Sequence, residues 1–261
     1  MKLTIYQVDA FASRVFEGNP AAVSVIDHWP DDSVMQKIAG ENNLSETAFV
    51  LPAGDQYEIR WFTPAVEVDL CGHATLAAAH VLFRHCDHPG DKIRFHSPRS
   101  GKLSVEKSED VLTLNFPADV LKNVKVPEAI REALGIAPVK ALKGRTDYLL
   151  VYSSQRELVK MKPDFNRLAG AGVRGVIVTA PGENVDFVSR FFAPGAGINE
   201  DPVTGSAHTS LTPYWSKELG KKRMTAYQVS ARGGELVCEL IGPRVKISGR
   251  AVTYMIGEIR Y

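Results

Sequence analysis

Two stretches of this chain carry the same succession of residue types, and this internal repeat limits the folds that the chain can adopt. The first runs from Arg60 through Trp-Phe-Thr-Pro to Gly72, and the second from Arg190 through Phe-Phe-Ala-Pro to Gly205. The arginine lies 12 residues before the glycine in the first copy and 15 in the second, so the second copy contains about three extra residues, around 195–200. Two such copies imply two related halves, and we expect one site between them.

Each copy predicts the same local structure. An extended aromatic run is followed by a proline turn and then by a glycine at the start of a helix. In the first copy that helix is alanine-rich, from Ala74 to Phe83, with apolar residues at helical spacing. A helix that starts directly after a turn presents unpaired backbone N–H groups and a positive end to an anionic group. The repeat therefore predicts two places where an anion can bind.

The rest of the chain predicts further strands and helices in both halves. Alternating apolar and polar residues indicate strands, and capped periodic segments indicate helices. We expect strands at 2–8, 22–26, 57–62, 92–96, 102–107, 111–116, 148–152, 175–180, 224–230, 234–241, 245–248 and 251–259, and helices at 34–41, 74–83, 127–134 and 206–219. The predicted fold class is α+β, with two pseudo-symmetric halves, each a curved, mainly antiparallel sheet around a central helix. The first half would span 1–116, completed by the strand near 251–261, and the second 117–250.

The composition is that of an ordinary soluble protein. Of the 261 residues, 44% are hydrophobic and 23% charged, and a net charge of +1 gives no reason to expect nucleic acid or a membrane as a partner. No apolar run approaches the roughly 20 residues of a membrane span. The three cysteines, Cys71, Cys86 and Cys238, match neither a disulfide framework nor a zinc motif. We expect a cytoplasmic protein that uses no nucleotide cofactor and no metal.

Six short motifs resemble one known family. In chain order they are Val8-Asp-Ala-Phe, Gly18-Asn-Pro, Leu44-Ser-Glu-Thr-Ala-Phe, Arg60-Trp-Phe-Thr-Pro, Glu67-Val-Asp-Leu-Cys-Gly-His-Ala-Thr and Glu200-Asp-Pro-Val-Thr-Gly-Ser-Ala. Together they resemble the PhzF-like (phenazine biosynthesis-like) family of the diaminopimelate-epimerase-like superfamily, over essentially the whole chain. The resemblance implies two barrel-like halves, an active site in the cleft between them and an isomerase that needs no cofactor. Because relatives often pair, a homodimer is also plausible.

The resemblance assigns the acid/base chemistry to a carboxyl group. Epimerases of the superfamily use two cysteines, each opening a Cys-Gly turn. Here the first turn is Cys71-Gly72, but the second is Thr204-Gly205. A threonine hydroxyl is too weakly acidic for this role, which excludes racemisation by two cysteines. The resemblance therefore implies that Glu46 is the general acid/base, and we interpret Cys71 as a small buried residue.

Three residues are the candidate catalytic groups. Glu46 would move one proton between two positions on one face of a substrate, although unaided it reads as a surface glutamate at the end of a strand. His73 could donate a hydrogen bond to the substrate or relay a proton, although a lone histidine is more often structural. Asp201 precedes a proline and alone would read as a turn residue. The resemblance makes it a substrate partner that bonds an amine or hydroxyl, or adjusts the acidity of Glu46.

The substrate-binding candidates come from the repeat and from the resemblance. Gly72 and Gly205, with Ser206, would offer backbone N–H groups and a hydroxyl to a carboxylate or an enolate-like oxygen. Each glycine alone is an ordinary turn residue, but its occurrence in both copies favours a shared role. Asn19 follows from the resemblance as a weaker contact. The segment 85–88, in which His85 and His88 flank Cys86, is a weak metal signal because it lacks further ligands.

These observations predict an isomerase that moves a proton, and with it a double bond, on a small carboxylate-bearing metabolite. One alternative is an epimerase or racemase that uses Glu46 with a second base other than cysteine. Another is a ligand-binding protein that has kept the cleft and lost the chemistry. The sequence leaves the identity of the substrate open.

Overall fold

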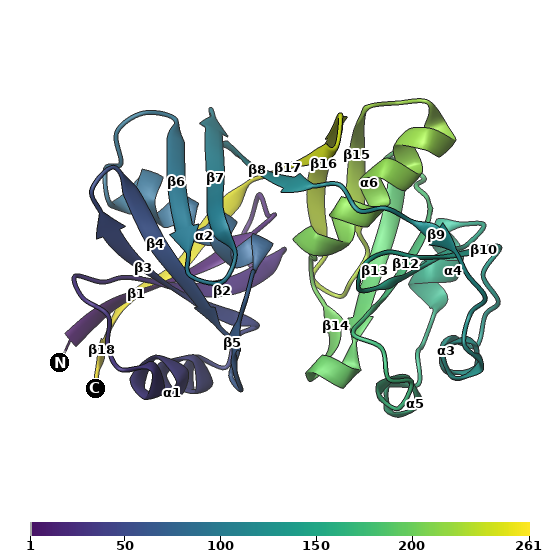
Figure 1. Ribbon diagram of the computed structural model, residues 1–261, viewed down its shortest axis with the longest axis horizontal. Coiled ribbons are helices and arrows are strands. Elements are labelled where there is room, and N and C mark those ends of the chain that lie inside the picture. Colours follow the sequence, from purple (N-terminus) through teal and green to yellow (C-terminus); the bar gives the residue numbers. More distant parts are fainter. Residues whose placement is uncertain (1) are drawn as a thin grey trace. The chain divides into compact units, whose positions relative to one another are not determined.

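The computed structural model describes residues 2–261, which form two compact units (Figure 1). Unit 1 contains the residues up to Asn115 together with Ser248–Tyr261, and unit 2 contains Phe116–Ile247. The chain leaves unit 1 in strand β8 (Val111–Pro117) and returns to it in strand β17 (Arg244–Gly249). Unit 2 is therefore one continuous segment, whereas unit 1 is built from both ends of the described chain.

Unit 1 is a sheet with two helices. Its elements are β1 (Lys2–Ala10), β2 (Asn19–Val25), α1 (Asp32–Asn42), β3 (Glu46–Ala53), β4 (Gln56–Phe62), β5 (Glu67–Val68), α2 (Gly72–His85), β6 (Lys92–Ser97), β7 (Gly101–Ser108), β8 and β18 (Ala251–Arg260). Strand β1 pairs antiparallel with β18 and with β2. Strands β2 and β3 run parallel, and β4 lies antiparallel to β3 but parallel to β6. The antiparallel pairs β6–β7 and β7–β8 follow.

Unit 2 has a similar set of elements with extra short helices. They are β9 (Lys122–Asn123), α3 (Glu128–Leu134), β10 (Lys140–Lys143), β11 (Tyr148–Val151), α4 (Gln155–Lys160), α5 (Phe165–Ala169), β12 (Val176–Pro181), β13 (Phe187–Ala193), the 3-10 helix η1 (Pro194–Ala196), β14 (Ile198–Asp201), α6 (Gly205–Leu219), β15 (Arg223–Gln228), β16 (Gly234–Ile241) and β17. Strands β11 and β12 run parallel, β12 and β13 antiparallel, β13 and β15 parallel, and β15 and β16 antiparallel.

The two units repeat one order of strand pairings. A parallel pair (β2–β3, β11–β12) leads into an antiparallel pair (β3–β4, β12–β13), followed by a short antiparallel strand (β5, β14) and a helix (α2, α6). The strand after the helix returns parallel to the second strand of the hairpin. Such a return needs a crossover connection, which the helix provides. The predicted α+β class with a mainly antiparallel sheet is confirmed.

The helix of unit 1 is central because its side chains are small. Helix α2 contacts β1, β2, β3 and β18, and Figure 1 shows it enclosed by the strands of its unit. Ala74, Ala77, Ala78 and Ala79 have no exposed surface. Alanine gives the helix high intrinsic stability and lets neighbouring strands approach closely. The alanine-rich run of the first copy is thus the core of unit 1.

An arginine–glutamate pair holds the repeated turn in each unit. The guanidinium of Arg60 makes two hydrogen bonds to Glu67, of 2.7 and 2.9 Å, and Arg190 bonds Glu200 with the same two distances. Both glutamates lie five residues before the glycine that starts the helix. The extra residues of the second copy lie between its arginine and its glutamate, where η1 is found. The internal repeat seen in the sequence is thus also a repeat of side-chain contacts.

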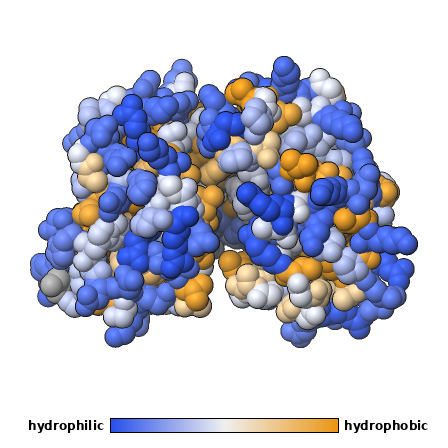
Figure 2. All heavy atoms as spheres, in the orientation of Figure 1, coloured by the Kyte–Doolittle hydropathy of each residue, from blue (hydrophilic) through white to orange (hydrophobic). Residues whose placement is uncertain are grey.

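The apolar residues gather in the unit cores. Among the large exposed hydrophobic side chains, Tyr254, Met255 and Ile256 are consecutive in β18 and Phe16 contacts Tyr254. The face visible in Figure 2 shows small hydrophobic groups among hydrophilic ones rather than one broad patch. Within residues 2–261, none of the helices has the length and apolar character needed to cross a bilayer.

Candidate active site

Glu46 and His73 lie against each other in unit 1. Glu46 is the first residue of β3, where it pairs in register with Ala21 of the parallel strand β2, and His73 is the second residue of α2. Their closest atoms, Glu46 Oε2 and His73 Nε2, are 3.2 Å apart, and their side chains are 12% and 5% exposed. Neither atom has a hydrogen-bond partner within the described residues, because the pair is close but not aligned for one. The contact is electrostatic.

Asn19 and Cys71 lie at the other nitrogen of the same imidazole ring. The Asn19 side-chain nitrogen is 3.2 Å from His73 Nδ1, and Cys71 Sγ is 3.4 Å from it. Asn19 is completely buried at the start of β2. The preceding Gly18 has φ +67°, and a Cβ atom there would lie 2.2 Å from a backbone oxygen, Ala10 O. Glycine therefore fixes the tight turn that brings Asn19 to the ring.

The charge state of this cluster follows from burial and from the carboxylate. Burial and the Glu46 charge raise the pKa of the Cys71 thiol to about 11, so the thiol is protonated at neutral pH. Burial disfavours the imidazolium form of His73, but Cys71 and Glu46 favour it more and hold the pKa of His73 well above its usual value. Because the thiol is neutral at pH 7, Glu46 supplies the negative charge that stabilises the imidazolium. His73 Nε2 therefore carries a proton on the side of the ring that faces Glu46.

Asp201 lies in a separate, tightly bonded cluster in unit 2. It is the last residue of β14 and 8% exposed, and its Oδ2 accepts a 2.5 Å hydrogen bond from the Thr204 hydroxyl. Gln228, completely buried in β15, accepts a bond from the Thr204 backbone N–H and donates one to the Asp201 carbonyl, at 2.9 and 2.8 Å. Gln228 thus fixes the turn between β14 and α6 and, through it, the Asp201 carboxylate.

The two glycines predicted at helix starts are the first residues of α2 and α6. In both helices the residue before the glycine is extended and its carbonyl accepts a side-chain bond from the first turn. Thr75 donates to Cys71 O at 2.6 Å, and His208 Nδ1 lies 2.8 Å from Thr204 O. Ser206, the second residue of α6, is exposed. Both helix starts therefore have a side-chain bond across the first turn, with the first backbone N–H groups at the positive helix end.

The structure brings the candidates into two groups, one in each unit. Asn19, Glu46, Gly72 and His73 belong to unit 1, and Asp201, Gly205 and Ser206 to unit 2. Their catalytic and binding roles remain predictions. Cys71 is buried, as interpreted from the sequence, but its contact with His73 was not predicted. The i, i+2 spacing was the available signal, and it is unreliable where a strand enters a helix. Nothing in the sequence pointed to Gln228, which lies 27 residues from Asp201.

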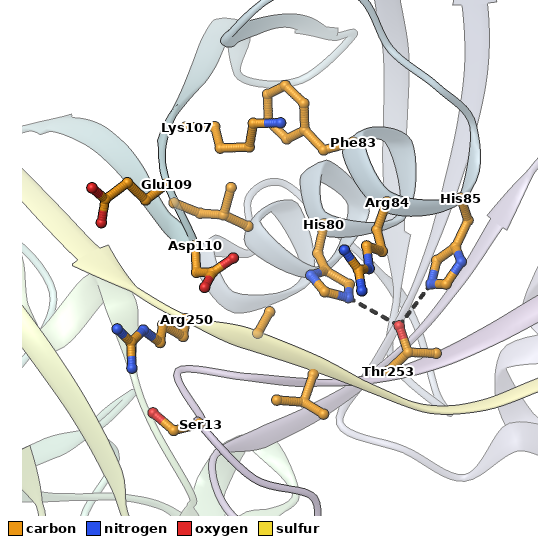
Figure 3. A pocket seen from close by; sticks show the side chains of 13 residues that line it. Ser13, His80, Phe83, Arg84, His85, Lys107, Glu109, Asp110, Arg250 and Thr253 are labelled. Carbon is orange, nitrogen blue, oxygen red and sulfur yellow. Dashed lines mark hydrogen bonds between the residues drawn. The ribbon is translucent and has the colours of Figure 1, made fainter.

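A separate pocket of about 580 Å³ lies in unit 1 and contains none of these candidates (Figure 3). His80 and His85 of α2 both point to the hydroxyl of Thr253 in β18, at 2.9 and 2.8 Å. Burial, with smaller contributions from His85 and Arg84, lowers the pKa of His80 to about 4. The pocket lining mixes cationic and anionic side chains with these neutral imidazoles, so it shows no preference for one ligand charge.

One group within residues 2–261 has the donor atoms of a metal site. Ligand atoms of Glu46, Cys71 and His73 lie within 4.8 Å of one another. The segment 85–88, which the sequence suggested as a weak metal signal, does not form a comparable group, because its histidines have other partners. His85 Nε2 contacts Thr253, and both nitrogens of His88 contact neighbouring groups of its own unit.

Known proteins match this chain over nearly its full length. An "uncharacterized isomerase" of Pseudomonas aeruginosa is 56% identical over 261 residues, covering 100% of this chain and 99% of that protein. A crystal structure of a phenazine biosynthesis protein of the PhzF family from Enterococcus faecalis is 48% identical, with a TM-score of 0.97 and full coverage of both chains.

The fold extends to more distant proteins. A probable proline racemase from Agrobacterium radiobacter, 11% identical, has a TM-score of 0.67 over 99% of this chain and 93% of its own, which shows a shared fold alone. The model of the phenazine biosynthesis-like protein family matches residues 8–257. This chain therefore belongs to the phenazine biosynthesis-like, or PhzF, family.

Proposed function

We propose that this protein is an isomerase that transfers a proton within a small carboxylate-bearing metabolite and so shifts a double bond, without a cofactor. The observation that carries the proposal is the buried Glu46 carboxylate, 3.2 Å from His73 Nε2 at the start of α2. A placed carboxylate can take a proton from carbon and return it elsewhere. The isomerase names of relatives that are 54% and 56% identical support the same reaction class.

The proposed reaction balances without an oxidant or reductant. Glu46 takes a proton from a carbon next to a conjugated system, and the C–H electron pair forms a new double bond while the existing one moves along the substrate. The protonated Glu46 then gives the proton to the carbon at the far end. His73, with its raised pKa, would donate a hydrogen bond to the developing negative charge. Because Glu46 faces the ring, the imidazolium would also hold the carboxylate in place.

The remaining candidates would bind the substrate. We propose that the backbone N–H groups of Gly72 and Gly205 and the Ser206 hydroxyl bind its anionic groups, and that Asn19 and Asp201 orient it. The burial and hydrogen bonding of Asp201 support a positioning role, since Thr204 and Gln228 hold its turn rigidly. A fixed site lowers the barrier because the reacting groups need no rearrangement during the reaction.

Deuterium exchange tests the proposal directly. Wild type, Glu46→Gln and a matched control, Glu58→Gln, are incubated in D2O with pooled small carboxylates, and mass spectrometry and NMR report deuterium and double-bond position. Glu58, in the neighbouring strand β4, accepts a bond from Trp29, which a glutamine can keep. We expect uptake into one compound class, with a shifted double bond, for wild type and Glu58→Gln only.

Other outcomes separate the alternatives. Equal uptake by wild type and Glu46→Gln would remove Glu46 from the mechanism. Uptake with inversion of a stereocentre, and no shifted double bond, would identify an epimerase that works with a second base. A ligand retained by the protein without any uptake would identify a binding protein.

A further inference from the structure

The three side chains around the His73 ring are also a set of metal ligands. Cysteine sulfur, histidine nitrogen and carboxylate oxygen are the donors that zinc prefers in proteins, and three protein ligands with one open position form its common non-structural arrangement. Glu46, Cys71 and His73 supply one of each. No other such group occurs in the part of the chain that the structure describes.

The spacing of the donor atoms is close to that of a bound zinc ion. Bonds of about 2.0–2.3 Å place tetrahedral ligand atoms roughly 3.5 Å apart. Glu46 Oε2 lies 3.2 Å from His73 Nε2, whereas Cys71 Sγ lies 3.4 Å from the other ring nitrogen, Nδ1. With one ligand atom taken from each residue, the three atoms lie within 4.8 Å of one another. Side-chain movements of roughly 1 Å would therefore close the site around an ion of this size.

The burial of the group is a second, independent indication. His73 and Cys71 are 4% and 6% exposed, so neither side chain is surrounded by water. His73 Nε2 and Glu46 Oε2 are buried without hydrogen-bond partners in the described residues, although they lie side by side. A cation coordinated by both atoms would replace this ion pair with metal–ligand bonds.

We propose that Glu46, Cys71 and His73 bind Zn²⁺, and that the bound ion inhibits the enzyme by occupying its proton-transferring carboxylate. Binding releases to solvent the Cys71 thiol proton and the proton of the His73 ring nitrogen that coordinates the ion, so it is favoured as the pH rises. The inhibitory half rests on the proposed function of Glu46. A carboxylate that coordinates zinc is a much weaker base toward a substrate C–H group, because the cation draws on its negative charge, and the coordinated imidazole is held away from the developing charge. Cys71 then acts as the residue that makes this site sensitive to metal, without a part in the proton transfer itself.

Cobalt titration tests the metal site without measuring turnover. In a Cys86→Ser background, which removes the exposed thiol, Co²⁺ should produce thiolate-to-cobalt absorption in the near ultraviolet that saturates at one ion per chain. One equivalent of Zn²⁺ should abolish it. Adding Cys71→Ala should remove the absorption, whereas adding Cys238→Ala, the matched change at the other buried thiol, should keep it. His73→Ala should weaken cobalt binding at least tenfold.

Two results would overturn the metal site: no near-ultraviolet absorption in the Cys86→Ser protein, or undiminished absorption after Cys71→Ala. Cys71→Ser repeats the test with a side chain of similar size, and circular dichroism checks that each variant is folded.

For the inhibitory half, one equivalent of Zn²⁺ should slow deuterium exchange at least tenfold, and a chelator should restore it. Exchange unchanged by Zn²⁺ in protein that binds cobalt would refute inhibition alone. Failure of the Glu46 proposal leaves the cobalt result unaffected.

Discussion

His208 should make unit 2 sensitive to acid. The residue is completely buried in α6, its Nδ1 contacts the Thr204 carbonyl, and its ring lies 6.1 Å from that of Phe187. Burial lowers the pKa of His208 from 6.5 to about 4. The unfolded chain therefore binds a proton between these pH values that the folded unit excludes. The contribution of His208 to the free energy of unfolding is fully present above pH 6.5 and is lost as the pH falls to about 4.

The expected size follows from the same two pKa values. A difference of about 2.5 pH units at about 1.4 kcal/mol per unit gives a loss of about 3 kcal/mol from this one side chain. Such a loss is a large part of the 5–15 kcal/mol that is typical of a folded domain. Below about pH 4 the folded unit also takes up the proton, and His208 causes no further loss.

The assay compares wild type with His208→Asn, whose amide can keep the donor to the Thr204 carbonyl but does not titrate. Urea unfolding of protein labelled with fluorotryptophan, followed by ¹⁹F NMR, isolates unit 2 through Trp215, which stacks on Phe187. The asparagine variant should be weaker at every pH because it leaves a cavity. Between pH 6.5 and 4.5 it should lose about 2 kcal/mol less than wild type. Equal losses over that interval would refute the reasoning.

Three further predictions concern unit 1 and the repeated turn. Glu46→Gln should lower the pKa of His73 by about 1–3 pH units, because the carboxylate stabilises the imidazolium, and an unchanged imidazole titration by NMR would contradict this. Gly18→Ala should cost about 2–4 kcal/mol in chemical unfolding, since strain and a backbone clash add, whereas Gly54→Ala, with a similar φ of +68° and open space, should cost about 1. Arg190→Met should lower the free energy of unfolding of unit 2 by about 3 kcal/mol in urea, because it leaves the half-buried Glu200 carboxylate without its partner. A loss below about 1 kcal/mol would show that the pair is dispensable.

The long elements of the fold could be predicted from the sequence because their pattern is periodic. The predicted helix at 74–83 is observed as α2, Gly72–His85, and the predicted helix at 206–219 as α6, Gly205–Leu219. Two short helices of unit 2, α4 and α5, were missed, since six and five residues are too few to show a period. A local signal existed for α4: Ser154 and Glu157 form a capping pair, in which the serine side chain accepts from the glutamate N–H.

The candidate site was predictable only as far as residue types and their order. The paired turns indicated Gly72 and Gly205, and the resemblance added Glu46. The contact of Glu46 with His73 depends on the parallel pairing of β2 with β3, and sequence periodicity contains no information on strand neighbours. For the same reason the support that Gln228 gives to Asp201 could not be foreseen.

The discontinuous make-up of unit 1 has a consequence for synthesis on the ribosome. The chain of unit 2, Phe116–Ile247, emerges as one piece, so the second unit can be the first to finish folding. Strand β1 pairs with β2 early, but its other neighbour, β18, begins only at Ala251. Ala251 is 136 residues beyond Asn115, so at about 5–20 residues per second that edge of β1 stays unpaired for roughly 7–27 s after Asn115 has been added. An unpaired strand edge invites pairing with other chains, so nascent unit 1 is where we expect a need for chaperones.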